Sequence, residues 1–333
     1  MRKVSRIFEL ISEVPSVSIV GLDKNTGKTV VLNHLIGLLA AKSIRAGITS
    51  VGLEGEKIDQ VFLTEKPEIY LRSGTLFATS ERDFAAREFP ATVLDLREFR
   101  SPLGRTVIAQ ARADGKIVIS GPSIIDYLLE TVRLLKDLGA EKIIVDGAVS
   151  RLSPGSPFVS DALILSTGAS VASSVDEIVR RTVHAVRLIS LGGVESDIAQ
   201  RLEPLTNGVW LLQDGCRKLA GTGLLLQVKP DEIRSGVVYI NGSLTSATLR
   251  RLAVADVTVV ARDFTKIFAD SDSLSYFSRA GGELKVLYPA RLLAVTVNPT
   301  SPTGYHLRSE AMIEALEKEL RVPVFDVLRE GVS

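Results

Sequence analysis

The chain has 333 residues, long enough for one large domain or for two domains that share an interface. Its 45% hydrophobic and 5% aromatic residues are typical of an aliphatic-rich globular protein. The 40 basic and 39 acidic side chains nearly cancel, so no overall charge favours nucleic acid or an anionic membrane as a partner. A single cysteine, no signal-peptide pattern and no apolar run of about 18 residues lead us to expect a cytoplasmic protein without membrane spans.

Strands and helices are predicted to alternate along the first 190 residues. Strands are expected at residues 17–20, 46–51, 117–120, 142–145 and 162–166, and helices at residues 4–14, 29–41, 124–138 and 175–191. Such alternation favours an α/β fold with a mostly parallel sheet and helices on both faces, because each parallel crossover must return to the same edge.

The remainder of the chain is less regular. Residues 191–236 form short segments punctuated by glycine, and we expect an insertion of uncertain structure there. Further strands are predicted at residues 237–241, 257–261, 284–287, 292–297 and 324–327, with helices at 243–252 and 310–320. We therefore expect a core at 1–190 and a C-terminal α/β part at 237–333, which either stands alone or continues the same sheet.

A glycine-containing loop lies between the first strand and the helix after it. Its sequence is Gly21-Leu-Asp-Lys-Asn-Thr-Gly27-Lys28-Thr29. The end fits the P-loop (Walker A) pattern G-x-x-x-x-G-K-[ST], in which backbone amides cradle phosphates, the lysine reaches the terminal phosphates and the hydroxyl binds Mg²⁺. The first glycine lies one residue early. The alternative is an ordinary strand–loop–helix turn that matches by accident.

We predict that this loop binds ATP together with Mg²⁺, since the helix that follows points its free amides at an anion. No N-K-x-D guanine motif occurs, which favours ATP over GTP. Lys24 either adds charge to the phosphate site or is simply solvated. The predicted nucleotide contacts in the loop are Asp23, Lys24, Asn25, Thr26, Gly27, Lys28, Thr29 and Val30.

A carboxylate follows the strand at residues 142–145 and has the form of a Walker B acid. Asp146 is predicted to act in catalysis with Lys28 and, together with Thr29, to hold Mg²⁺. The alternative is a turn aspartate that precedes Gly147 at the end of a strand.

Three acidic residues follow the second strand, on the edge where ligands of open α/β sheets bind. We predict Glu54 as a metal ligand and Glu56 as a catalytic residue, with Asp59 as a further candidate. The alternative is an acidic loop that is only solvated.

The loop resembles the G-x-D-x-x-x-G-K-T loop of dethiobiotin synthetases and related P-loop proteins of the SIMIBI class, which accounts for the longer glycine spacing. A series of motifs over most of the chain resembles the small ATPase-like subunit of the lysine 5,6-aminomutase reactivase family. These motifs are Gly47-Ile-Thr-Ser-Val-Gly52, Gly55-Glu-Lys-Ile-Asp59, Lys66-Pro67-Glu-Ile, Gly74-Thr75, Gly121-Pro122-Ser123, Val145-Asp146-Gly147-Ala148 and Thr296-Val-Asn298-Pro299-Thr-Ser-Pro302.

The resemblance implies an ATP-driven accessory protein. Such a protein would help an adenosylcobalamin-dependent aminomutase to release inactivated cofactor and accept a fresh one, together with a protein partner resembling MutS. Asn298 resembles the late-strand asparagine that contacts the purine in dethiobiotin synthetase-like proteins, and the alternative is a proline-rich turn that ends the strand.

Two other functions fit a phosphate loop. One is a dethiobiotin synthetase-like ligase that activates a small carboxylic acid with ATP, although the sequence shows no evident acid–base pair near the loop. The other is a nucleotide sensor without turnover. A homo-oligomer is compatible with all three functions.

Overall fold

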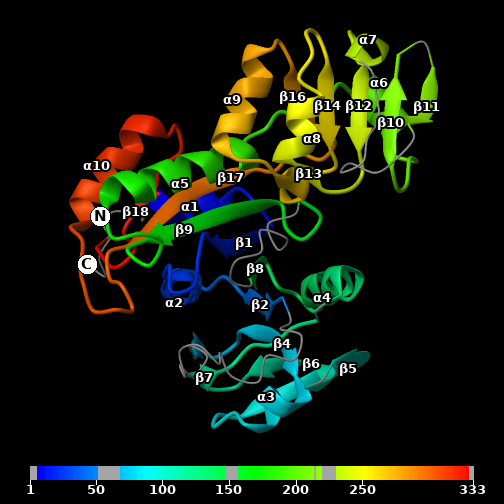
Figure 1. Cartoon of the computed structure of the whole chain (residues 1–333). Helices are drawn as coiled ribbons and strands as arrows, with labels where there is room; N and C mark the ends of the chain where they lie inside the picture. Colours follow the sequence, from blue (N-terminus) through cyan, green and yellow to red (C-terminus); the bar gives the residue numbers. More distant parts are fainter. Residues whose placement is uncertain are drawn as a thin grey trace. The chain divides into compact units, whose positions relative to one another are not determined.

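The computed structural model describes residues 6–51, 68–101, 103–122, 124–147, 157–213, 215–219 and 230–329. The chain forms two compact units (Figure 1). One comprises Met1–Thr182 and Leu292–Ser333, and the other comprises Val183–Arg291. No helix in the described ranges is long and apolar enough to cross a membrane.

A nine-stranded sheet forms the centre of the first unit, in the order β18-β17-β9-β1-β8-β2-β4-β6-β5. The strands from β18 to β4 pair in parallel, whereas β4–β6 and β6–β5 are antiparallel. The predicted α/β fold with a mostly parallel sheet is confirmed at this level. The strands are β1 (Ser16–Gly21), β2 (Ala46–Ser50), β4 (Leu76–Ser80), β5 (Ala91–Ser101), β6 (Gly104–Ala111), β8 (Lys142–Asp146), β9 (Ala162–Gly168), β17 (Leu292–Asn298) and β18 (Val324–Phe325).

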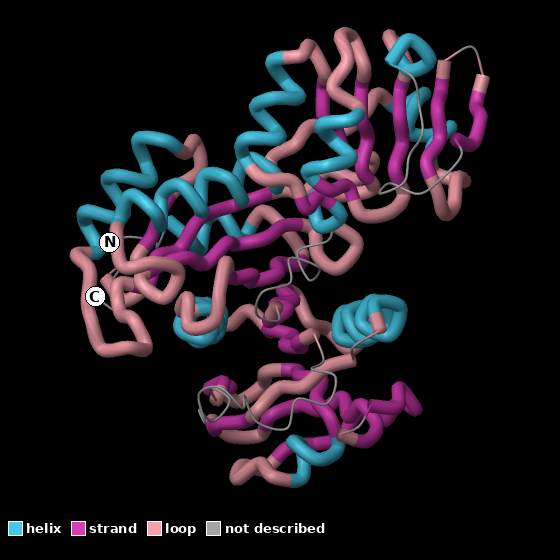
Figure 2. Tube along the Cα trace, in the orientation of Figure 1, coloured by secondary structure: helices cyan, strands magenta, loops and turns pink. Residues whose placement is uncertain are grey.

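Helices cover both faces of this sheet, and α2 and α4 lie on opposite sides of its strands (Figure 2). Successive side chains of a strand point to opposite faces. Accordingly Ile144 of β8 packs in one core cluster with α2, and Ile143 and Val145 pack in another with α4. The helices that lie within or reach into this unit are α1 (Arg6–Ser12), α2 (Lys28–Ala41), α3 (Glu81–Ala85), α4 (Ile125–Asp137), α5 (Val175–Ile189) and α10 (Ser309–Glu319).

The strand predicted at residues 117–120 is not part of the central sheet, so this prediction is wrong. The chain instead forms β7 (Gly115–Ile117), which pairs antiparallel with β3 (Ile69–Leu71) in a separate ribbon. The residues after β7 accept hydrogen bonds from hydroxyl groups of the central sheet. Ser50 Oγ, at the end of β2, donates to the Ile119 carbonyl at 2.9 Å. The hairpin of β5 and β6, which the sequence analysis did not predict, extends the sheet instead.

The second unit contains a five-stranded sheet in the order β11-β10-β12-β14-β16. Strands β12, β14 and β16 are parallel, and β10 and β11 are antiparallel to their neighbours. The last residues of α5 belong to this unit. Its other helices and strands are α6 (Ser196–Leu202), β10 (Val209–Leu212), β11 (Cys216–Leu219), α7 (Pro230–Ile233), β12 (Val237–Ile240), β13 (Leu244–Thr245), α8 (Ser246–Arg251), β14 (Thr258–Ala261), β15 (Ile267–Phe268), α9 (Ser271–Arg279) and β16 (Glu283–Val286).

This division into two units differs from the expected one. The sequence analysis placed boundaries after residues 190 and 236. Strand β10 lies inside the expected insertion, yet it pairs with β12 along its whole length, from Val209–Ile240 to Leu212–Val237. Residues 191–236 therefore contribute a strand to the same sheet as β12. Only β17 and β18 of the expected C-terminal part return to the nine-stranded sheet.

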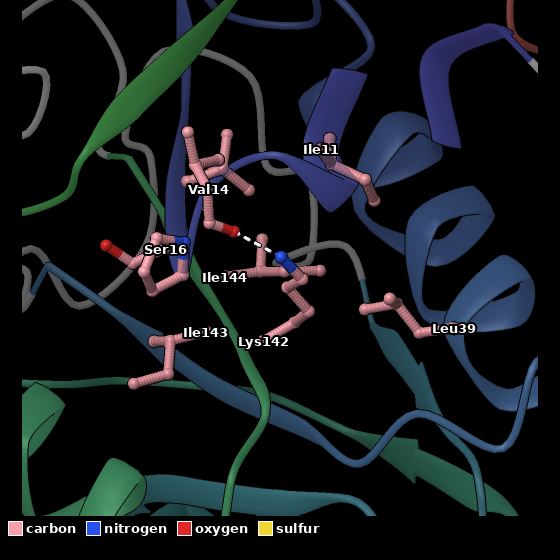
Figure 3. Close-up of a pocket in the computed structure, with 9 residues that line it drawn as sticks. Ile11, Val14, Ser16, Leu39, Lys142, Ile143 and Ile144 are labelled. Atoms are coloured by element: carbon pink, nitrogen blue, oxygen red, sulfur yellow. Dashed lines mark hydrogen bonds between the residues drawn. The ribbon is translucent and has the colours of Figure 1, made fainter. Parts of the chain in front are cut away.

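A small apolar crevice lies at the amino ends of β1 and β8 (Figure 3). There Lys142 Nζ donates to the carbonyls of Ser12 at 2.7 Å and Val14 at 2.5 Å. Ser12 is the last residue of α1 and Val14 follows the helix, whose own last turn contains no basic residue. Burial lowers the pKa of Lys142, and Asp161 opposes this shift. The lysine thus stabilises α1 at the end of the strands opposite the phosphate loop.

Candidate functional site

The predicted phosphate loop leaves the carboxyl end of β1, a central strand with β8 on one side and β9 on the other. Its first amide is anchored to the neighbouring strand, because Leu22 N donates to the Ser166 carbonyl at 3.0 Å. The loop then ends at Gly27, and α2 begins at Lys28. Ligands of open parallel sheets bind at this edge, where the loops after the strands converge.

The loop closes around its own lysine. Lys28 is buried, with 8% of its surface exposed, and its Nζ lies 3.4 Å from the Asp23 carbonyl, to which it donates. Thr26 Oγ1 donates to the same carbonyl at 3.1 Å. A Cβ on Gly21 would come within 2.4 Å of Thr26 Oγ1 and 3.0 Å of Lys28 Nζ. The missing side chain of Gly21 therefore leaves room mainly for the Thr26 hydroxyl and also for the Lys28 ammonium.

The start of α2 is open to an anion. Gly27, the N-cap residue of α2, takes the left-handed conformation with φ +88° and provides no side-chain cap for the first amides of the helix. The Val31 amide, which donates to the Gly27 carbonyl at 3.0 Å, begins the helical hydrogen bonds. The amides before it point along the helix axis toward the loop, and the helix dipole adds partial positive charge at this end. This arrangement suits a phosphate group.

Asp146 ends β8, and it lies opposite Ile19 of β1 in the sheet register. Burial raises the pKa of its carboxyl to about 6, although the nearby Lys28 ammonium opposes the shift. Burial likewise lowers the pKa of Lys28, opposed by Asp146 and then Asp23. The Oδ1 atom of Asp146 is buried and has no hydrogen-bond partner among the described residues. Buried polar atoms are normally paired, so this oxygen is a candidate contact for a ligand or a water molecule.

Asn298, at the end of β17, reaches the loop from a strand that is separated from β1 by β9. Its Nδ2 donates to the Asn25 carbonyl at 2.9 Å, and its Oδ1 accepts from the Thr300 amide at 3.2 Å. A Cβ on Gly27 would lie 3.0 Å from the Asn298 Cβ. Both ends of the Asn298 side chain are thus engaged by the protein itself.

The structure brings Asp146 and Asn298 to the predicted loop. The other predicted nucleotide contacts, Asp23 to Val30, all lie in the described part of the chain, in the loop and at the start of α2. The three acidic candidates Glu54, Glu56 and Asp59 lie outside the described residues. The sequence analysis missed Ser166, whose carbonyl anchors Leu22. Its only signal was its place in the last position of a predicted strand, which many structural residues share.

No group of three or more His, Cys, Asp or Glu that could hold a metal ion occurs among the residues described. This finding is compatible with Mg²⁺ in a nucleotide site, where one or two carboxylates suffice because phosphates and water supply the other ligands. The Oδ1 atom of Asp146 is a carboxylate oxygen, the type of ligand that Mg²⁺ prefers. The Thr29 hydroxyl, in the first turn of α2, is the second candidate ligand.

Comparison with protein families, curated proteins and solved structures gave no match for the chain. Support for a function therefore comes from the geometry of the loop and from the motifs in the sequence.

Proposed function

We propose that the chain binds ATP with Mg²⁺ at residues 21–29 and hydrolyses it. The observation that carries the proposal is that a buried lysine at the start of α2 lies near a buried carboxylate oxygen of Asp146 that has no hydrogen-bond partner in the described part of the chain. The Lys28 ammonium works against the rise in the pKa of Asp146, and Asp146 works against the fall in the pKa of Lys28. Burying charged atoms is costly unless their charge is compensated, and a bound nucleotide with Mg²⁺ would compensate both.

Each residue has a separate task in this proposal. The amides at the start of α2 and the Lys28 ammonium hold the phosphates. The Thr29 hydroxyl and the Asp146 carboxylate hold Mg²⁺, directly or through water. Bound Mg²⁺ would neutralise charge that develops on the phosphates. Asp146 must be ionised for this task, and a nearby cation favours that state.

ATP hydrolysis is proposed to drive a conformational change. The motifs that resemble the aminomutase reactivase family suggest that nucleotide turnover changes the conformation of this chain and of a protein partner resembling MutS. The client would be an adenosylcobalamin-dependent aminomutase that holds damaged cofactor.

The first experiment tests the loop itself. ATP affinity is measured by titration calorimetry for the wild type, for Lys28→Ala and for a control, Lys42→Ala, which changes an exposed lysine just after the end of α2. Loss of charged hydrogen bonds to phosphate should weaken ATP binding by about 10- to 100-fold in Lys28→Ala. The control should bind normally. Equal affinity in all three proteins would rule out the loop as the ATP site.

The second experiment separates the three functions by following phosphate release. A reactivase should hydrolyse ATP slowly alone and faster with an inactivated aminomutase and a MutS-like partner. A ligase should consume ATP when a small carboxylic acid is the sole addition. A sensor should bind ATP and release no phosphate under either condition, which would contradict the proposed hydrolysis.

A further inference from the structure

Strand β5 is the long outer edge of the nine-stranded sheet (Figure 1). It spans Ala91–Ser101 and pairs with β6 on one side, and no described strand lies on its other side. The opposite edge, β18, contains only Val324–Phe325. A long strand with a free edge presents backbone groups that a further strand can bind.

The free edge carries exposed apolar side chains. Val93 is 50% exposed, and Leu94 and Leu96 are each 39% exposed. The surface continues onto α4, because the Tyr127 ring stacks on Phe99 with 4.5 Å between the ring centroids. Large apolar side chains gathered at one edge favour contact with another protein surface.

Two opposite charges flank the middle of the strand. Asp95 and Arg97 lie on either side of Leu96 and form an ion pair of 2.9 Å, with 33% and 37% of their side chains exposed. The Leu96 amide donates to Asp95 Oδ1 at 2.7 Å, so pairing through this amide requires it to exchange the Asp95 carboxylate for a carbonyl of the added strand. Irregularities interrupt the ladder with β6 between Val93 and Asp95 and again after Arg97. Residues 95–97 are therefore the regular stretch between them.

We propose that two copies of this chain associate through β5, with the two strands antiparallel and the two-fold axis at Leu96. In this register Asp95 of each copy lies opposite Arg97 of the other, and the two Leu96 side chains meet. Opposite charges on facing residues stabilise an antiparallel pair, and like charges destabilise it. Centring the axis on residue 95 or residue 97 instead would place identical charges opposite each other. The sequence of the strand thus selects one register, and a two-fold axis uses the same patch twice.

The other sheet edges are less suitable. Strand β16 has a similar charge pattern, Glu283-Leu-Lys285, but the chain covers its outer side. Val286 N donates to the Gly192 carbonyl at 3.0 Å, and Val194 N donates to the Val286 carbonyl at 3.1 Å. Strand β11 carries the adjacent charges Arg217 and Lys218, so two-fold pairing there would bring like charges together.

The test measures the mass of the full-length protein in solution by analytical ultracentrifugation. The wild type should form a dimer. Asp95→Arg and Arg97→Asp should each weaken it by about tenfold or more, because two attractions become two repulsions. The double variant Asp95→Arg/Arg97→Asp exchanges the charges and should restore the dimer. Mixing the two single variants should yield a heterodimer, since all facing charges are then opposite.

Arg217→Asp, a charge reversal on the edge strand of the other sheet, is the matched control and should leave the dimer intact. Circular dichroism checks that every variant is folded. A wild type that stays monomeric up to about 0.1 mM would overturn the proposal. It would also be overturned by a dimer that is insensitive to both single reversals, or by single variants that fail to associate on mixing while remaining folded. None of these results depends on nucleotide binding.

Discussion

The Nδ2 atom of Asn298 donates to the carbonyl of Asn25 at 2.9 Å, joining two residues that are 273 positions apart in the chain. Asn25 itself has a positive φ of 58°, which is uncommon outside glycine. The Oδ1 atom of Asn298 is held by the Thr300 amide. The end of β17 therefore restrains the phosphate loop in a conformation that the loop would not hold by local preference alone.

Replacing Asn298 should loosen the loop. We expect Asn298→Ala to weaken ATP binding by about fivefold to tenfold, the range of one lost hydrogen bond. Asn298→Asp keeps the acceptor for Thr300 but removes the donor to Asn25, so it should have a similar effect. Calorimetric titrations with ATP, GTP and inorganic triphosphate provide the measurement.

Comparing ATP, GTP and inorganic triphosphate distinguishes two roles for Asn298, which are to restrain the loop and to contact the base. If Asn298 restrains the loop, its substitution weakens all three, including triphosphate, which has no base. If Asn298 instead contacts the purine, binding of triphosphate stays unchanged and the preference between ATP and GTP shifts.

The Asp146 carboxyl should make Mg²⁺-dependent binding sensitive to pH. Its pKa of about 6 means that it becomes protonated as the pH falls through this value, and a protonated carboxyl is a poor metal ligand. In the wild type, the gain in ATP affinity on adding Mg²⁺ should decrease by up to about tenfold per pH unit below 6. In Asp146→Asn the gain should be small at every pH. A wild-type gain that is equal at about pH 5 and pH 7 would contradict this role.

The same shift predicts a change in stability without ligand. The folded pKa of Asp146 lies above its ordinary value of 3.8, so folding favours the protonated form. Its contribution to the free energy of unfolding is present below pH 4 and is lost as the pH rises toward about 6. Urea unfolding of the wild type and of Asp146→Asn across this range measures the contribution. The difference between the two proteins should change with pH in this window and level off above it.

Two glycine-to-alanine substitutions should affect different properties, one the binding of ATP and the other the free energy of unfolding. Gly21→Ala would place a methyl group 2.4 Å from Thr26 Oγ1, so the loop must shift and ATP binding should fall at least about tenfold. Gly37 lies inside α2, and apart from its own turn of helix no described atom lies within 4 Å of an added Cβ. Gly37→Ala should therefore raise the free energy of unfolding by about 1 kcal/mol without changing binding. Calorimetry and urea unfolding measure both effects, and normal binding by Gly21→Ala would refute the close approach at the loop.

Lys142 should matter for stability and not for binding. Lys142→Met removes the donor to the carbonyl of Ser12, the last residue of α1, and to that of Val14 just after it, and should lower the free energy of unfolding by about 1–3 kcal/mol. Lys136→Met, at an exposed position in the last turn of α4, is the control and should have little effect. Urea unfolding gives the comparison. Equal stability of the two variants would show that the contact with α1 is not stabilising.

The sequence alone determined the local parts of the site. The strand before residue 21, the loop and the helix from Lys28 are adjacent in the chain, so hydrophobic pattern and glycine position were enough to predict them. Asp146 was identifiable for the same reason, because it directly ends a strongly apolar strand.

Only the tertiary structure decided which strands lie side by side. The sequence indicated a strand before Asn298 and another before Gly21, but pattern alone does not show that β9 lies between them. Likewise β10 and β12 form one sheet apart from β17, although all three follow the first core in the chain. Strand order is set by packing between distant segments, which hydrophobic periodicity does not encode. The contact of Asn298 with Asn25 depends on that order, and so it became visible only in the folded chain.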